Sequence, residues 1–271
     1  RPSELPGCDV MPGSKSYRWV ILALAFQSQF AATLAASTVP PLAPLLQSEM
    51  GLTKAEIGVF SSAAFAGSWC VLLAGGYWTE RFGVRRTMSL GLLLAGSVML
   101  TMALVGSFLQ AVVVMFAVGL SRGVVQPGAS KAVMDWFPAH ERATAMGVKQ
   151  TGYPIGAIIL GVGLPALALA VGWRIAIALV GVLLISGGTV TAVFYRGPSG
   201  SRLASGGKDI SRALRQLLLN RLLWMLSAVS LLLLIAQLGL TSYLALYFSE
   251  VVLVESVPDL NARIITAGIF L

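Results

Sequence analysis

Charged residues are scarce in this chain of 271 residues, where they make up 11% of the total. An average soluble domain carries about a quarter. Hydrophobic residues reach 56% and the mean hydropathy is +0.83. The core of a bilayer, about 30 Å thick, needs roughly 20 apolar residues per helix. The composition therefore excludes an ordinary soluble domain and predicts a membrane protein.

Cysteine and histidine are also rare, with two cysteines and one histidine in the whole chain. Cys8 and Cys70 are separated by a loop and by the depth of a membrane, so neither a disulfide framework nor a metal site is indicated. His140 falls in a loop. There is no nucleophile elbow, no His-Glu-x-x-His pattern and no phosphate-binding glycine loop followed by Lys-Ser. We therefore expect no enzyme activity, no cofactor and no metal.

Long apolar runs dominate the sequence. They lie at about 18–46, 55–78, 87–105, 109–134, 143–170, 174–195 and 217–248. Each is too long for a barrel strand of about 10 residues, so these runs predict helices and an all-α polytopic fold. An eighth run begins near Ala262 and is still short at Leu271, from which we expect a C-terminally truncated chain or a fragment. Residues 1–16 contain no apolar segment of a signal peptide.

The net charge of +8 is distributed unevenly. If the amino terminus is cytoplasmic, most lysines and arginines fall in cytoplasmic loops, and only Lys54, Arg174 and Arg263 fall outside. This distribution follows the positive-inside rule and predicts a multi-pass protein of the plasma (inner) membrane with a cytoplasmic amino terminus. Nucleic-acid binding is disfavoured, because no soluble domain is available to present a basic face.

Four parts follow from the spacing of the runs. We expect a cytoplasmic tail at 1–16, a bundle of six helices at 17–195, a basic linker rich in Gly and Ser at 196–216, and an incomplete second half at 217–271. Six helices, a basic cytoplasmic linker and further helices are the layout of a transporter built from two six-helix halves.

The sequence GGYWTERFGVRRT, residues 75–87, lies between two apolar runs. It resembles the cytoplasmic signature of the major facilitator superfamily (MFS), with Glu80 where that family usually has Asp and Val84 after the second glycine. The resemblance implies that this loop stabilises one conformational state. The residues concerned are Gly76, Glu80, Arg81, Gly83, Arg85 and Arg86. A positive-inside loop with no further role is the alternative.

Elementary physics suggests a role for each part of this loop. Gly76 would allow close approach of a neighbouring helix, and Gly83 would permit a tight turn. Glu80 could pair with the arginines or face a helix amino terminus of the second half. Asp135 is a second candidate partner.

The segment 121–161 strengthens the resemblance, because a mid-membrane Arg, a Trp-Phe-Pro turn and a glycine-rich following helix recur in many facilitators. Arg122 lies about 18 Å into its helix, near the middle of the bilayer. A charge at this depth is costly and marks a candidate functional site. Gln126 lies one turn further on the same face, and we expect Pro127 and Gly128 to interrupt the helix.

Other polar side chains are expected to line the same cavity. They are Lys149, Gln150 and Tyr153 of the run 143–170, Gln27 of the first run, and Gln237 and Tyr243 of the run 217–248. Such a cavity is positive and favours an anion, with Arg122 as its fixed partner. Alternatively, Arg122 is structural, Lys149 extends toward the cytoplasmic surface, and the glutamines and tyrosines bond between helices. Gly152, Gly156 and Gly161 indicate close helix packing.

The sequence thus predicts a secondary active transporter, a symporter in the simplest case, that moves a small organic anion such as a carboxylate by alternating access. A proton-coupled drug efflux antiporter of the same superfamily and, more remotely, a seven-helix receptor are the alternatives. No acidic residue lies deep in the seven runs, so H+ and Na+ both stay open as the coupling ion. The expected partners are the substrate and the lipid bilayer, and the complete protein is expected to be a monomer.

Overall fold

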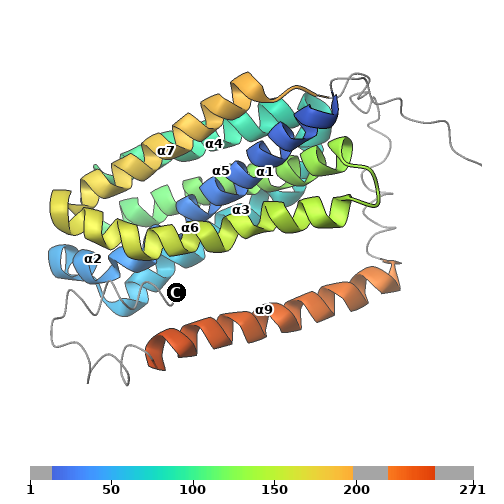
Figure 1. Cartoon of the computed structure of the whole chain (residues 1–271). Coiled ribbons are helices and arrows are strands. Elements are labelled where there is room, and N and C mark those ends of the chain that lie inside the picture. Colours follow the sequence, from blue (N-terminus) through green and yellow to red (C-terminus); the bar gives the residue numbers. More distant parts are fainter. Residues whose placement is uncertain (1–13, 198–218, 248–271) are drawn as a thin grey trace, which may run out of the picture.

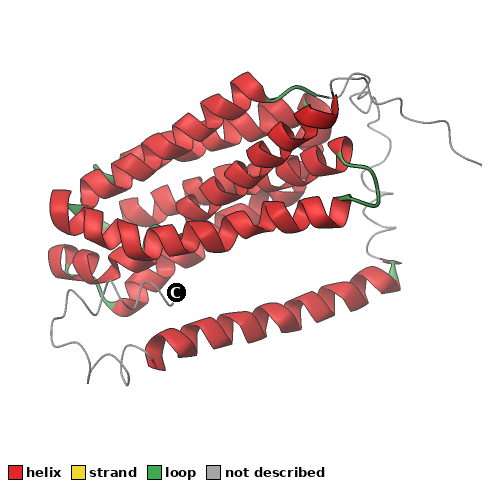
Figure 2. Cartoon of the chain, viewed as in Figure 1, coloured by secondary structure: helices red, strands yellow, loops and turns green. Residues whose placement is uncertain are grey.

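A computed structural model describes residues 14–197 and 219–247, and every regular element in these ranges is helical (Figures 1 and 2). The elements are α1 (Ser14–Ser37), the 3-10 helix η1 (Pro40–Leu42), α2 (Ala43–Met50), α3 (Lys54–Phe82), α4 (Val84–Met102), α5 (Phe108–Trp136), α6 (Arg142–Val171), α7 (Trp173–Phe194) and α9 (Arg221–Tyr247). The predicted all-α class is confirmed.

Five of these helical segments are long and apolar enough to cross a membrane: Ser16–Leu42, Ala55–Phe82, Phe108–Trp136, Arg142–Val171 and Trp173–Phe194. The α4 helix, with 19 residues, starts almost at once with two arginines. It nevertheless runs within the same bundle (Figure 1). The chain is therefore a multi-pass membrane protein.

The first predicted run, 18–46, is not one helix. The α1 helix ends at Ser37, and Pro40 and Pro41 lie in a 3-10 turn that precedes α2. Proline lacks a backbone N–H and clashes with the preceding turn, so it ends an α-helix. The apolar composition of the run concealed this break, and the predicted boundary was wrong.

Short, well-defined turns connect the long helices. Thr53 caps α3, because its hydroxyl accepts from the Glu56 N–H at 3.3 Å while the Glu56 carboxylate accepts from the Thr53 N–H at 2.8 Å. Gly83 joins α3 to α4 with φ of +85°, and Gly172 joins α6 to α7 with φ of +89°. Only glycine adopts such φ values without strain. The tight turn predicted at Gly83 is confirmed.

The bundle is held together by close helix contacts. The α3 helix packs along α5, α4 packs along α7 and α5, and α1 packs along α6 and α5 (Figure 1). Glycines lie at the closest points: a Cβ built on Gly119 of α5 would lie 2.1 Å from the Ala64 carbonyl oxygen of α3. Small residues let helix backbones approach one another in a membrane. Gly152 and Gly156 of α6 do this against α1, as predicted.

The α9 helix lies apart from this bundle in Figure 1. Its described side chains, residues 221–233 with 235 and 236, are all exposed. Of the predicted linker 196–216, only residues 196 and 197 fall within the described ranges.

Candidate functional site

Arg122 lies midway along α5, half-buried, with its guanidinium over the ring of Phe65 on α3 at 5.4 Å from the ring centroid. Its Nε is buried and has no hydrogen-bond partner, and it forms no ion pair with any described residue. Arg122 is therefore a positive charge at membrane depth that stacks on an aromatic face and has no carboxylate partner among the described residues.

The α5 helix is continuous from Phe108 to Trp136, with Pro127 inside it. The predicted interruption at Pro127 and Gly128 was therefore wrong. A proline within a membrane helix is tolerated because neighbouring helices and local adjustments compensate for the lost hydrogen bond. Gly128 instead faces Met88 of α4, 2.7 Å from the position of an added Cβ.

Two side chains of α6 lie near this part of α5. Tyr153 of α6 is partly exposed. Lys149, one turn earlier, is only 3% exposed, and its Nζ donates to the Ser130 hydroxyl at 3.0 Å. That hydroxyl in turn donates to the Gln126 carbonyl at 3.2 Å. The structure thus brings together the predicted residues of α5 and α6, but it buries Lys149 between the helices.

The other predicted residues of the cavity lie elsewhere. Gln27 points toward α7, where its Oε1 accepts from the Thr191 hydroxyl at 3.4 Å and its amide lies against Gly187. This is the interhelical role that the sequence offered as the alternative. Gln150 is exposed. Gln237 and Tyr243 belong to α9, and their side chains are outside the described part of the structure.

In the predicted conformational loop at the α3–α4 turn, the arginines form hydrogen bonds but the carboxylate forms no ion pair within the described residues. Arg85 donates through Nε to the Ala192 carbonyl at the end of α7 at 2.7 Å, and Arg81 donates to the Tyr77 hydroxyl at 3.2 Å. Glu80 is exposed and forms no ion pair within the described residues. Asp135 is likewise exposed and unpaired there.

Among the described residues, nothing lies within 4 Å of a Cβ built on Gly76, so the expected close helix contact is not seen there. The adjacent Gly75 has that role: its added Cβ would lie 3.0 Å from the Gly123 carbonyl oxygen of α5. Adjacent residues of a helix point about 100° apart, so sequence alone could not choose between two consecutive glycines.

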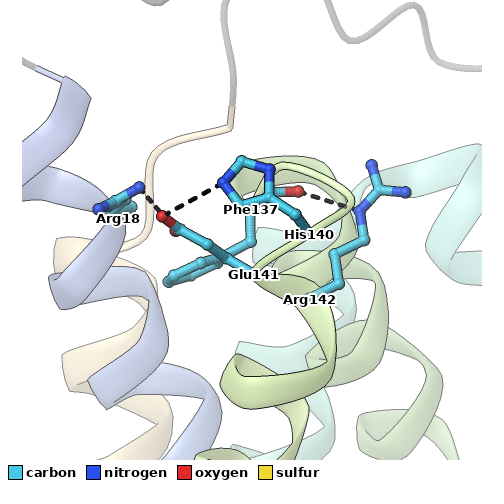
Figure 3. A network of polar contacts seen from close by, with 5 residues as sticks. All are labelled: Arg18, Phe137, His140, Glu141 and Arg142. Carbon is cyan, nitrogen blue, oxygen red and sulfur yellow. Dashed lines mark hydrogen bonds and ion pairs between the residues drawn. The ribbon is translucent and has the colours of Figure 1, made fainter.

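A polar network at the start of α1 was missed by the sequence reasoning (Figure 3). Arg18 of α1 forms an ion pair with Glu141 of the α5–α6 loop at 2.8 Å, and His140 lies 3.7 Å from the same carboxylate. Arg142 donates to the Phe137 carbonyl at 3.0 Å. The network joins α1 to the connection between α5 and α6. The sequence signal that could have indicated this network is Glu141, an acidic residue beside the basic residues His140 and Arg142.

Phe65 and Ser130 were also missed. An exposed phenylalanine and a helical serine carry no functional signal alone, and only the packing of α3, α5 and α6 brings them to Arg122 and Lys149. Within the described residues, no three His, Cys, Asp or Glu side chains are grouped so that they could hold a metal.

Comparison with known proteins identifies the family. The family model of the Major Facilitator Superfamily matches residues 25–266, so the chain belongs to this superfamily of membrane transporters. It is similar to the probable sulfoacetate transporter of Cupriavidus necator, with 29% identity over 180 residues, which cover 66% of this chain and 42% of that protein. It is also similar to the hexuronate transporter of Bacillus subtilis, with 25% identity over 153 residues, covering 56% of this chain and 35% of that protein.

A solved structure agrees in fold. The inward-facing, unoccupied structure of a bacterial homolog of the human lysosomal transporter Spinster has a TM-score of 0.72 at 18% identity, covering 95% of this chain and 60% of that one. The chain spans less than half the length of the two curated relatives. Their names describe transporters, which agrees with the expectation that this protein is not an enzyme.

Proposed function

We propose that the protein moves a small organic anion, a carboxylate or sulfonate, across the membrane by alternating access. Arg122 carries this proposal as the fixed partner of the anion. Burying a guanidinium at membrane depth is costly, and an anionic ligand that pairs with it offsets the cost. In the described residues no carboxylate fulfils this role.

The neighbours of Arg122 support a ligand site. Phe65 holds the guanidinium from one side, and Tyr153 adds a phenol from α6. A planar guanidinium stacked on a ring keeps its outer N–H groups in a fork that suits a carboxylate or sulfonate. The two curated relatives are named for sulfoacetate and hexuronate, which are both anions.

The proposed cycle uses two halves. Residues 17–195 form the first half, 196–216 the cytoplasmic linker, and the rest of the full-length protein the second half, with the substrate between them. The turn from Gly76 to Arg86 stabilises one of the two states, and substrate shifts the equilibrium only by its differential affinity for them. The protein lies in the plasma (inner) membrane with a cytoplasmic amino terminus, because the arginines of its loops gather on one side.

The test uses the full-length protein in proteoliposomes with labelled sulfoacetate, glucuronate, a neutral sugar and a lipophilic cation. Arg122→Ala is compared with wild type, and Arg174→Ala, which removes an exposed arginine at the start of α7, is the control. Loss of one partner of a buried charge pair costs about 2–5 kcal/mol, so we expect anion uptake to fall at least roughly 30-fold. Uptake of the cation or the sugar by wild type, or anion uptake unaffected by Arg122→Ala, would contradict the proposal.

A further inference from the structure

Lys149 is a buried cation that the proposed binding of the anion does not use directly. Lys149 is 3% exposed, and its hydrogen-bond partner among the described residues is the neutral hydroxyl of Ser130. Arg18, by contrast, reaches the carboxylate of Glu141. An ammonium held without water or a counter-charge is unfavourable, and losing a proton removes that penalty.

Lysine and arginine differ in this respect. Arg122 keeps its proton under all conditions that a protein meets, whereas a buried lysine exists as the cation or as the neutral amine. The described carboxylates and the histidine lie in loops or at helix ends. They are Glu49, Glu56, Glu80, Asp135, His140 and Glu141. Within the described bundle, Lys149 is therefore the buried base available to exchange a proton.

No described charge compensates for Lys149. Within the described structure, its helix α6 packs against α1, α7, η1 and α5. Apart from Lys149, the charged or titratable residues of α1, α5, α6 and α7 whose side chains are described are Tyr17, Arg18, Arg122, Lys131, Asp135, Arg142, Tyr153 and Arg174. None of them forms a hydrogen bond or an ion pair with Lys149.

Hydrogen bonds connect Lys149 to the site around Arg122. Lys149 donates to Ser130, and Ser130 donates to the carbonyl of Gln126, one helical turn from Arg122. Tyr153 lies one turn after Lys149 on the same face of α6. A change in the charge of Lys149 is therefore close enough to alter the affinity of the site for an anion.

We propose that Lys149 carries the coupling proton, so that the coupling ion is H+; this inference rests on the proposed anion transport. The neutral amine takes up a proton from the outer side as the anion binds, and the resulting ammonium strengthens the positive site. After reorientation the ammonium releases the same proton to the cytoplasmic side, and the anion leaves. Lys149 lies about 10 Å along α6 from Arg142 at the cytoplasmic end, so the exit path is short.

The experiment measures proton entry and anion entry together. Full-length protein is placed in proteoliposomes that contain a pH-sensitive dye, and labelled glucuronate or sulfoacetate is added outside. For wild type we expect the lumen to acidify as the anion enters. Lys149→Arg keeps the positive charge, whereas Lys149→Gln removes it. For both variants we expect the ratio of accumulation driven by a pH gradient to anion exchange between equal concentrations to fall roughly 5- to 150-fold, the usual size of coupling between sites. Lys131→Gln is the matched control.

The outcomes are distinguishable. If wild type takes up neither anion, the proposed function fails. If wild type takes up an anion without acidification, or if both Lys149 variants accumulate it as wild type does, the assignment of the proton to Lys149 is wrong. Should the Lys149 variants not fold, as judged by gel filtration, Ser130→Ala decides: removing the hydroxyl should shift the pH at which uptake is half-maximal, and an unchanged pH profile overturns the inference.

Discussion

The contact between α3 and α5 gives the sharpest prediction about stability. A Cβ added at Gly119 would lie 2.1 Å from the carbonyl oxygen of Ala64 and 2.8 Å from its carbonyl carbon. A second contact supports the first, because a Cβ at Gly67 would lie 2.2 Å from the Phe116 carbonyl oxygen. Both obstacles are backbone, so no side chain can rotate away. Gly119→Ala therefore requires the two helices to move apart.

The size of the effect follows from this separation. Carbon and oxygen in contact lie about 3.3–3.6 Å apart even in weak hydrogen bonds, so the helices must separate by roughly 1 Å. A gap of 0.5–1 Å already forfeits about a quarter to a half of the dispersion energy of the atoms concerned. The hydrogen bond from Ser68 to the Gly119 carbonyl, 3.1 Å long, is weakened as well. Overpacking of this kind costs about 1–3 kcal/mol.

Gly76→Ala is the control, because Gly76 lies on α3, the partner helix of Gly119, and no described atom lies within 4 Å of its added Cβ. Alanine is favoured over glycine in a helix by about 1 kcal/mol, so this variant should be as stable as wild type or more so. The apparent melting temperature of the purified full-length protein in detergent is measured for both. We expect Gly119→Ala to melt roughly 2–10 °C lower. Equal melting temperatures for the two variants would refute the argument from close backbone contact.

Three smaller predictions concern contacts at the helix ends. Thr53→Ala removes the cap of α3 and should cost about 1 kcal/mol, seen as faster hydrogen exchange in its first turn. Trp173→Phe removes the 2.6 Å bond from the indole N–H to the Glu49 carboxylate and should cost about 1.5–3 kcal/mol; a melting temperature equal to that of wild type would contradict this. Arg18→Gln breaks the partly exposed pair with Glu141 and should change stability by at most about 1 kcal/mol, with any difference from wild type shrinking in high salt.

Much of the fold followed from the sequence because a bilayer permits few solutions. Apolar runs of more than 20 residues must be helical when no water is present to satisfy the backbone. The tight turn at Gly83 and the close contacts of Gly152 and Gly156 were also predicted correctly. The end of α1 before Pro40 was not predicted. Hydropathy was averaged over the whole apolar run, whereas proline ends a helix at a single position.

Only some residues of the candidate site could be predicted from the sequence. Arg122 was recognisable because a charge in the middle of an apolar run is costly wherever the helix faces. Gln27 was not, since its direction depends on how α1 is rotated against α7. Phe65 and Ser130 could not be recognised from the sequence, because their roles depend on the contacts that packing creates: the Phe65 ring with Arg122 and the Ser130 hydroxyl with Lys149.

The sequence by itself determined that this is a multi-pass helical membrane protein of the Major Facilitator Superfamily, because length, hydropathy and charge placement are properties of the chain read in one dimension. The tertiary structure decided which of two adjacent glycines meets a neighbouring helix, and that Lys149 is buried while Glu80 is exposed. These outcomes depend on the rotation of each helix about its axis. That rotation is set by the packing of backbone against backbone, which no single helix encodes alone.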